Sequence, residues 1–385
     1  MNRPVPTPYR MRRSPAPRIA LANSTTEYVL RFRLPLLAAL RNAGFEPVVV
    51  APPDGSEKAL TRLGYPCSPL TLDGAGMNPL RELGALRALT RLYRAIGPSL
   101  ALHFTPKVDI YGGLAARRLG IPAINNLSGM GTAFTRGGLL GFVVKQLMRV
   151  SQRAAAHIFV QNPDDAQFVA DAGIARPQKL STLPGSGIDL EQFPLTPLPS
   201  DTGQVHFVLI ARLVREKGVI EFMEAARQLR TAGVPARFSI AGAIPPGAGI
   251  DAAQVTAWGE APQQAWLGKV SDVQAVIAAS DCVVLPSYYR EGTPRVLLEA
   301  AAMGRPVIAA DAIGTREPVI PHETGLLCQP RAVHDLAECM KAMVDMSRDR
   351  RQAMGLAGRR LMQTKYDVRF VVDAYMQRIH QVLRE

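Results

Sequence analysis

Two glutamates eight residues apart, Glu291 and Glu299, flank a segment with the composition of a helix start. Between them lie Gly292, Thr293 and Pro294. Threonine is a favoured N-cap, and proline suits the first helical position because its missing N–H is not needed there. The unpaired N–H groups and the positive dipole end of such a helix bind anions, phosphate among them. The spacing therefore predicts a site that holds the phosphates of a ligand on the helix end and its hydroxyls on the two carboxylates.

The same residues have a simpler explanation. Arg295 and Glu299 are four residues apart and can form an exposed ion pair, worth roughly 0.2–0.5 kcal/mol, while Glu291 can be a solvated loop acid. The preceding residues favour a ligand site, because 281–287 has the composition of a short buried strand that ends in a turn. In open parallel α/β sheets, ligands bind beyond the carboxyl ends of the strands. Glu291 would lie there.

Three blocks of sequence resemble those of the retaining glycosyltransferases of family 4. They are 289–300 (YREGTPRVLLEA), similar to the E-x7-E signature of the family; 210–218 (IARLVREKG); and 183–190 (LPGSGIDL), ahead of Phe193. The blocks occur in the order seen in the family, and the resemblance covers nearly the whole chain. It implies the GT-B fold: an α/β protein with two doubly wound, Rossmann-like parallel-sheet domains facing a cleft.

The resemblance also implies which side chains carry the chemistry. Arg212 and Lys217 match the cations that bind the donor diphosphate, with an exposed helix-start lysine as the alternative for Lys217. Glu299 is assigned to the ribose hydroxyls of the nucleotide and Glu291 to hydroxyls of the transferred sugar. Negative charge grows on the departing nucleotide diphosphate, so fixed cations favour the transition state. No two aspartates lie two positions apart; we therefore expect no metal and no other cofactor, with a UDP-sugar as co-substrate.

Further contacts with the nucleotide sugar are implied along the same segment. Gly292 and Thr293 are expected to offer backbone N–H groups to the sugar–phosphate portion, and Pro294 to shape the loop. The base is expected near Trp266 and Val270, in a segment similar to the one that contacts it in relatives. A tryptophan in the hydrophobic core is the alternative for Trp266.

The first domain is expected to bind the acceptor. Its opening loop over 23–28, which includes Asn23, departs from the Gly-Gly loop common in family 4. This loop and the blocks over 104–112 and 126–134 resemble a subgroup that acts on polyprenyl-diphosphate-linked sugars, with related capsule and exopolysaccharide transferases. We predict Asn23 as an acceptor-binding residue.

Three more residues are candidates on the acceptor side. His103, which we also assign a catalytic role, and Lys107 lie at the mouth of a predicted strand and are candidates for contacts with the acceptor diphosphate or its hydroxyls. Gly129 can let the backbone approach a ligand closely. The alternatives are a core histidine at a strand end and a glycine that serves a tight turn.

Length and pattern predict two domains. With 385 residues, the chain exceeds one ordinary domain, and a linker rich in Pro, Thr and Ser lies over 193–203. We expect an acceptor-binding domain over 1–198, with residues 1–16 as a mobile basic arm, and a nucleotide-sugar-binding domain over 199–366. A C-terminal helix over 367–385 is implied by the resemblance to cross back to the first domain.

Strand-like runs alternate with helical stretches, as in parallel sheets covered by helices on both faces. The strands are expected over 18–22, 47–51, 100–104, 122–126, 157–161, 205–211, 237–241, 282–286 and 306–310. The helices are expected over 30–43, 79–95, 110–119, 139–155, 219–232, 272–279, 294–303 and 368–383.

The net charge of +13 is concentrated in the first domain. Residues 1–198 hold 23 Lys and Arg against 12 Asp and Glu, whereas the rest of the chain holds 22 against 20. Such a basic half predicts an anionic partner. Interleaved aromatic residues and known nucleic-acid motifs are missing, so we expect no nucleic acid and favour an anionic membrane surface. The apolar stretch 137–149, edged by basic residues, fits a helix lying on a membrane, or else a core helix with a basic edge.

The cysteines and the hydropathy pattern predict a compartment. Four scattered cysteines without a C-x-x-C pair indicate neither a disulfide framework nor a zinc site. No run of about 18 apolar residues is present, so no membrane span is predicted. We expect a cytoplasmic protein, peripheral at the inner face of the cytoplasmic membrane.

The leading hypothesis is a metal-independent, retaining glycosyltransferase. It would move a sugar, an N-acetylhexosamine or a similar one, from a UDP-sugar to a polyprenyl-diphosphate-linked saccharide in surface polysaccharide or glycan assembly. One alternative is a nucleotide-sugar epimerase of the same fold, which would need no acceptor. Another is a non-enzymatic adaptor for membranes or nucleic acid, supported by the basic charge alone.

Overall fold

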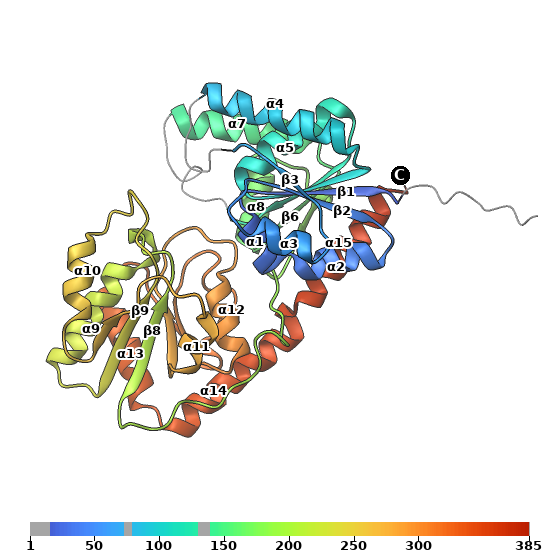
Figure 1. Ribbon diagram of the computed structural model, residues 1–385. Coiled ribbons are helices and arrows are strands. Elements are labelled where there is room, and N and C mark those ends of the chain that lie inside the picture. The colour runs from blue at the N-terminus through green and yellow to red at the C-terminus, as the bar shows by residue number, and fades with distance from the viewer. Residues whose placement is uncertain (1–15, 73–78, 130–138, 385) are drawn as a thin grey trace, which may run out of the picture.

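The computed structural model describes residues 16–72, 79–129 and 139–384, and within these residues it contains two separate parallel sheets (Figure 1). The first has seven described strands in the order β3-β2-β1-β4-β5-β6-β7, and the second has six in the order β10-β9-β8-β11-β12-β13. The predicted architecture of two doubly wound α/β domains is therefore confirmed. The basic arm predicted over 1–16 lies outside the described residues except for its last one.

The strands of the first domain are β1 (Arg18–Asn23), β2 (Glu46–Ala51), β3 (Cys67–Pro69), β4 (Leu100–Phe104), β5 (Ala123–Leu127), β6 (His157–Val160) and β7 (Leu180–Thr182). Those of the second domain are β8 (Val205–Ile210), β9 (Ala236–Ala241), β10 (Gln264–Trp266), β11 (Cys282–Leu285), β12 (Val307–Ala310) and β13 (Gly325–Cys328). The predicted strands all form. Four were not predicted: β3, β7 and β10, which have only three residues each, and β13.

The helices of the first domain are α1 (Thr26–Phe32), α2 (Leu34–Asn42), α3 (Glu57–Arg62), α4 (Pro79–Ile96), α5 (Pro106–Leu119), α7 (Leu139–Arg153) and α8 (Pro163–Asp171). Those that follow are α9 (Val219–Thr231), α10 (Ala252–Gly259), α11 (Val273–Ala278), α12 (Arg295–Ala302), α13 (Val333–Asp345), α14 (Arg348–Leu361) and α15 (Val368–Val382). None of these described helices is long and apolar enough to cross a membrane.

The long helix predicted over 30–43 is in fact two helices. Arg33 has φ −124° and ψ 1°, and it ends α1 while beginning α2. Pro35 lies in the first turn of α2, where its missing N–H costs nothing, but its ring would clash with the preceding turn of a continuous helix. α1 follows the carboxyl end of β1, and its last residue, Phe32, contacts Arg295 of the second domain.

Helices cover both faces of the first sheet (Figure 1). On one face, α4 and α5 pack through Leu89, Val108 and Ala115. On the other face, α1, α2 and α15 share a second cluster, in which Tyr375 and Ile379 of α15 lie among residues of β1, β2 and β4. The C-terminal helix is thus part of the core of the first domain, although α14, which precedes it, packs on the second.

The chain passes between the domains twice, and the two passages pack together. Ile188 accepts a hydrogen bond from Val368 at 2.9 Å and donates one to Tyr366 at 2.7 Å, so the crossings form a short parallel bridge. Gly187 has φ +73°, and a Cβ built there would lie 2.6 Å from Val368 Cα. The crossings therefore approach too closely for any side chain at position 187.

Gly187→Ala should destabilise the protein more than Gly203→Ala. Gly203 has the same φ of +73°, but its Cβ would meet nothing within 4 Å. Both variants incur the left-handed backbone penalty of about 1–2 kcal/mol, and only Gly187→Ala adds the overlap with Val368, costing about 1–3 kcal/mol more. Urea unfolding of both variants measures the difference. Equal losses of unfolding free energy would show that the crossings are not tightly packed.

Candidate functional site

A cleft of about 710 Å³ lies between the two domains and is lined by residues from both. Its second-domain wall is formed beyond the carboxyl ends of β8 and β11. These strands are neighbours in the sheet but not in the sequence, since β8 pairs with β9 on one side and β11 on the other. Ligands bind in open parallel sheets at this reversal of strand order.

Lys217 and Glu291 form an ion pair in this cleft. Lys217 Nζ bonds Glu291 Oε1, and Ser287 Oγ donates to the same oxygen at 3.0 Å. Both side chains are only 13% exposed, so Glu291 is not the solvated loop acid of the simpler explanation. The carboxylate is held by two donors that follow the ends of two neighbouring strands.

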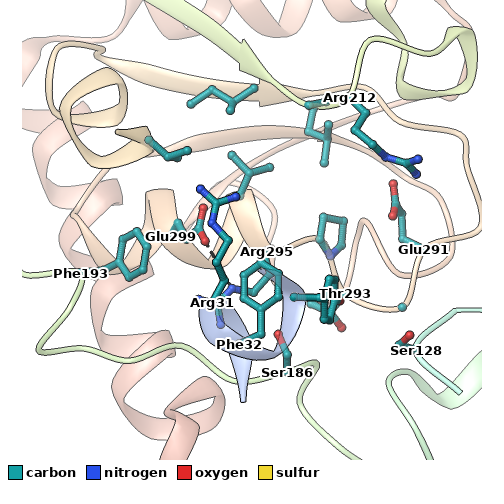
Figure 2. A pocket seen from close by; sticks show the side chains of 18 of the residues that line it. Arg31, Phe32, Ser128, Ser186, Phe193, Arg212, Glu291, Thr293, Arg295 and Glu299 are labelled. Carbon is teal, nitrogen blue, oxygen red and sulfur yellow. Dashed lines mark hydrogen bonds and ion pairs between the residues drawn. The ribbon is translucent and has the colours of Figure 1, made fainter. Parts of the chain in front are cut away.

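Arg212 supplies a second cation beside this pair. It follows β8 directly and lines the cleft with its side chain exposed. Figure 2 shows its guanidinium and the Glu291 carboxylate pointing toward one another. Among the described residues the Arg212 side chain has no hydrogen bond or ion pair, so its planar set of N–H donors is available to a phosphate.

Glu299 lies at the other end of the cleft, paired with Arg295. The Nε–Oε1 distance is 3.3 Å, and the two side chains are 15% and 11% exposed. Arg295 also stacks over the Phe32 ring of the first domain at 4.7 Å and donates to the carbonyl of Gly187. Burial lowers the pKa of Arg295, and Glu299 opposes that shift. Arg295 therefore contacts the first domain, and its helix pair with Glu299 is largely buried, unlike the exposed pair considered from spacing alone.

The start of α12 differs from the prediction. The helix begins at Arg295, with Pro294 as an extended N-cap at ψ 121°, so Thr293 does not cap it. Thr293 instead donates its backbone N–H to Gln161 Oε1 at 3.2 Å and its hydroxyl to the Gln161 carbonyl at 3.1 Å. The N–H of Thr293, predicted to bind phosphate, is thus taken by a side chain of the first domain.

The first domain contacts the loop around Glu291 at further points. Asn162 Nδ2 donates to the carbonyls of Glu291 at 3.3 Å and Gly292 at 3.2 Å. Arg290 Nε lies 2.8 Å from Asp165 Oδ1, and the Asp165 side chain is fully buried. Burial raises the pKa of Asp165, and the hydrogen bond from Arg290 opposes the increase.

Two predicted site residues lie away from the cleft. His103 is fully buried in the first domain, where its ring nitrogens lie 2.8 Å from Tyr93 Oη and 2.6 Å from Asn125 Oδ1. Trp266 donates its indole N–H to the carbonyl of Gly242 at 3.1 Å and packs against the core of the second domain. We correct both assignments, because polar partners inside each domain satisfy these side chains. Val270 packs against the other core cluster of the second domain, one residue before the cleft-lining Ser271.

The three acceptor candidates, Asn23, Lys107 and Gly129, lie in different parts of the first domain. Asn23 is fully buried, and its Oδ1 accepts the N–H of Ser24 at 2.7 Å. Lys107 Nζ lies 2.6 Å from Glu82 Oε1, and neither Asn23 nor Lys107 lines the cleft. Gly129 has φ +120° and lies against the loop of the second domain, since a Cβ there would be 2.8 Å from Gly292 N. Gly129 itself does not line the cleft, although its neighbour Ser128 does. Residues 130–134 of its block lie outside the described part of the chain.

Several residues of the cleft were not predicted from the sequence: Tyr28, Arg31, Phe32, Gln161, Asp272 and Arg295. For Gln161 a usable signal existed. It ends a predicted strand and precedes Asn-Pro-Asp-Asp, a helix start in which Asn162 is the N-cap and accepts from Asp165 N. The other residues have no local pattern that marks them. Among residues 16–72, 79–129 and 139–384, no group of three His, Cys, Asp or Glu residues could hold a metal ion.

Both halves of the chain match known glycosyltransferase families. Residues 31–185 match the family described as a glycosyl transferase 4-like domain, and residues 204–346 match the family described as glycosyl transferases group 1. Together the two matches span more than half of the chain. The chain therefore belongs to the glycosyltransferases of the GT4 type with the GT-B fold.

Individual relatives agree with this class. A protein of Campylobacter jejuni, N,N'-diacetylbacillosaminyl-diphospho-undecaprenol alpha-1,3-N-acetylgalactosaminyltransferase, is 24% identical over 95% of this chain and 99% of its own length. The capsular polysaccharide biosynthesis glycosyltransferase CapM of Staphylococcus aureus is 22% identical over 79% of this chain and 82% of its own. The structure of Anabaena Alr3699/HepE in complex with UDP superposes with a TM-score of 0.75, covering 95% of this chain and 100% of that one at 19% identity.

His103→Gln should flatten the pH dependence of stability. Burial lowers the pKa of His103 to about 4, so the folded protein keeps it neutral where the unfolded chain protonates it. Burial of the neutral ring contributes fully to the free energy of unfolding above the unfolded-state pKa of about 6.5, and this contribution is lost as pH falls toward 4. As pH falls from about 7.5 to 4.5, the free energy of unfolding of the wild type should decrease by about 2–3 kcal/mol more than that of the variant. Urea unfolding at both pH values tests this. The exposed His334→Gln serves as control, and identical slopes in all three proteins would contradict the assignment.

Proposed function

We propose that this glycosyltransferase moves a sugar from a UDP-sugar to a polyprenyl-diphosphate-linked saccharide with retention of anomeric configuration. The observation that carries the proposal is the convergence of Arg212, Lys217, Glu291 and Glu299 on one interdomain cleft. Two guanidinium or ammonium groups and two carboxylates match the phosphates and hydroxyls of a nucleotide sugar. The UDP bound in the HepE structure supports the donor, and the lipid-linked acceptor named for the Campylobacter jejuni relative supports the acceptor.

We propose a role in donor binding for each end of the cleft. Glu299 is at the α12 end and would accept hydrogen bonds from the ribose hydroxyls. Arg212 and Lys217 would meet the diphosphate, whose charge grows as the bond between the anomeric carbon and the phosphate oxygen breaks. A bound diphosphate would draw Lys217 from its pair with Glu291. The Glu291 carboxylate would then accept hydrogen bonds from hydroxyls of the sugar being transferred.

The acceptor is proposed to be reached from an anionic membrane surface. Residues 79–153 hold 11 Lys and Arg but only two acidic residues, Glu82 and Asp109, and neither acid is exposed. Most of these cations lie on α4, α5 and α7, the helices above the first sheet in Figure 1. A hollow on this side is lined by four arginines: Arg87, Arg91, Arg94 and Arg118. Phe142 of α7 is 60% exposed on the same group of helices. Cations beside exposed apolar side chains suit a surface of anionic lipids.

Lys217→Met should abolish transfer. The substitution keeps the length of the side chain but removes the charge that would meet the leaving diphosphate, so kcat/KM should fall at least about 100-fold. Arg215→Met, an exposed cation two residues away in the same turn, is the matched control and should keep wild-type activity.

The assay uses a UDP-N-acetylhexosamine with and without a short polyprenyl-diphosphate-linked acceptor. Product that forms only with the acceptor supports transfer, whereas an altered nucleotide sugar without acceptor indicates an epimerase. EDTA should have little effect, because cations of the chain take the place of a metal. Full activity of Lys217→Met would exclude the proposed role of the lysine.

Phe142→Ser should weaken membrane binding without affecting the cleft. Replacing an exposed apolar ring on α7 removes roughly 1–2 kcal/mol of burial in the interface, which corresponds to about a tenfold weaker partition into vesicles. Phe370→Ser on α15, where the ring is 44% exposed, is the matched control. Sedimentation with phosphatidylglycerol vesicles measures both variants. Equal binding of the two variants, or binding to neutral phosphatidylcholine alone, would contradict the proposed surface.

A further inference from the structure

We propose that Gln161 of the first domain is a positioning residue for the donor-site loop of the second domain, so that Glu291 is aligned only when the domains meet. The inference rests on the proposed function for its kinetic consequence, although the contact itself does not depend on any substrate. It concerns the loop between β11 and α12. Residues 290–293 of this loop touch residues 161–168, which form the junction after β6 and the first turns of α8.

All four loop residues contact the first domain. Arg290 pairs with buried Asp165 and lies over the Phe168 ring at 4.5 Å. The carbonyl of Gly292 accepts from Asn162, and Thr293 bonds Gln161 through both its N–H and its hydroxyl. The fourth residue, Glu291, also gives its carbonyl to Asn162, but its carboxylate is the loop side chain that points to Lys217. The first domain therefore sets the backbone from which the carboxylate projects.

The backbones at this contact are too close to allow another arrangement. A Cβ at Gly292 would overlap Gln161 Oε1 and lie 2.6 Å from the carbonyl oxygen of Ser128. A Cβ at Gly129, on the opposite side, would lie 2.8 Å from Gly292 N. No side chain separates the two backbones at Gly129 and Gly292. Beside this contact, the side chains of Gln161 and Asn162 bond the loop, so a shift of the segment 161–162 would move the loop.

The carboxamide of Gln161 has a fixed orientation because both of its ends are used. Oε1 accepts the N–H of Thr293, while Nε2 donates to Asn126 Oδ1 at 3.4 Å. Asn126 in turn donates through Nδ2 to Tyr375 Oη at 2.7 Å. Tyr375 belongs to α15, the helix that follows the second crossing between the domains. The hydrogen bonds thus run from the donor-site loop through two amides to the element that joins the domains.

This arrangement predicts that loss of the Gln161 amide lowers the rate of sugar transfer without lowering the affinity for the nucleotide. The groups proposed to bind the nucleotide, Arg212 and Glu299, belong to the second domain and do not contact Gln161. Loss of the amide should therefore leave nucleotide binding intact while Glu291 is no longer held for transfer. Misplacement of a reacting group by about 1 Å can cost up to about 100-fold in rate.

Gln161→Met tests the proposal, because methionine fills the same space without a donor or an acceptor. We expect kcat to fall roughly 10- to 100-fold, with the dissociation constant of UDP measured by calorimetry within about threefold of wild type. Gln167→Met is the matched control: Gln167 is on α8, and its side-chain amide donates to Asp171, one helical turn further on, at an exposed site. Its kcat should be unchanged. A fall in kcat matched by an equal loss of UDP affinity, or no fall at all, would overturn the proposal.

Hydrogen exchange provides a readout that needs no substrate. The amide of Thr293 should exchange faster in Gln161→Met than in wild type, while the amides of α12 keep their protection. Unchanged protection of Thr293 would overturn the proposal even if activity fell. If Gln161→Met does not fold, Asp165→Asn replaces it as the test variant, because it is an isosteric change at the buried partner of Arg290. It should lower kcat in the same way without weakening UDP binding. If the wild type transferred no sugar but Thr293 showed the expected exchange, only the proposed function would fail.

Discussion

The loop between β11 and α12 lies where the carboxyl ends of two parallel sheets face each other, and this constraint shapes the whole cleft. Strands of a parallel sheet all end at one edge, so each domain presents its loops to the other. The loop presents its backbone to Asn162 and Gln161 of the first domain and the Glu291 carboxylate to Lys217 of its own domain. Neither domain alone contains all of these partners. The geometry around Glu291 is therefore a property of the pair.

The buried polar contacts at this junction determine how the two domains are oriented more than they add to the stability of the protein. Asp165 is fully buried and keeps both Arg290 and Asn162 as partners. A buried ion pair gains little net stability because desolvation of both charges offsets their attraction, but separating the partners leaves an uncompensated charge. If the domains met in a different register, Asp165 would be left as a buried charge without its partner. Buried polar groups thereby favour one arrangement of the domains over others that pack equally well.

The two crossings of the chain limit how the domains can move relative to each other. α15 packs in the core of the first domain through Tyr375 and Ile379, whereas α14 belongs to the second. Since the crossings at Ile188 and Val368 are hydrogen-bonded to each other, any change in the angle between the domains bends both at one place. Arg295 lies close to that place, because it donates to the carbonyl of Gly187 while it pairs with Glu299. The arrangement of the domains and the end of the cleft at Glu299 are thus mechanically connected.

Local sequence predicted the two-domain fold and a site between Glu291 and Glu299, and the resemblance to family 4 added Arg212 and Lys217 to that site. Arg212 and Lys217 follow one strand and Glu291 and Glu299 another, and both short segments carry their own signal of a strand, a turn and a helix start. Tertiary structure alone decided the roles of residues whose partners are distant in the chain. Thr293 has the composition of an N-cap, yet Gln161, 132 residues away, takes both its N–H and its hydroxyl. His103 lies at a strand end as a site residue would, but Tyr93 and Asn125 enclose it in the core. A side chain of either kind can be satisfied equally well by a ligand or by another part of the protein, and only packing in three dimensions determines which partner is present.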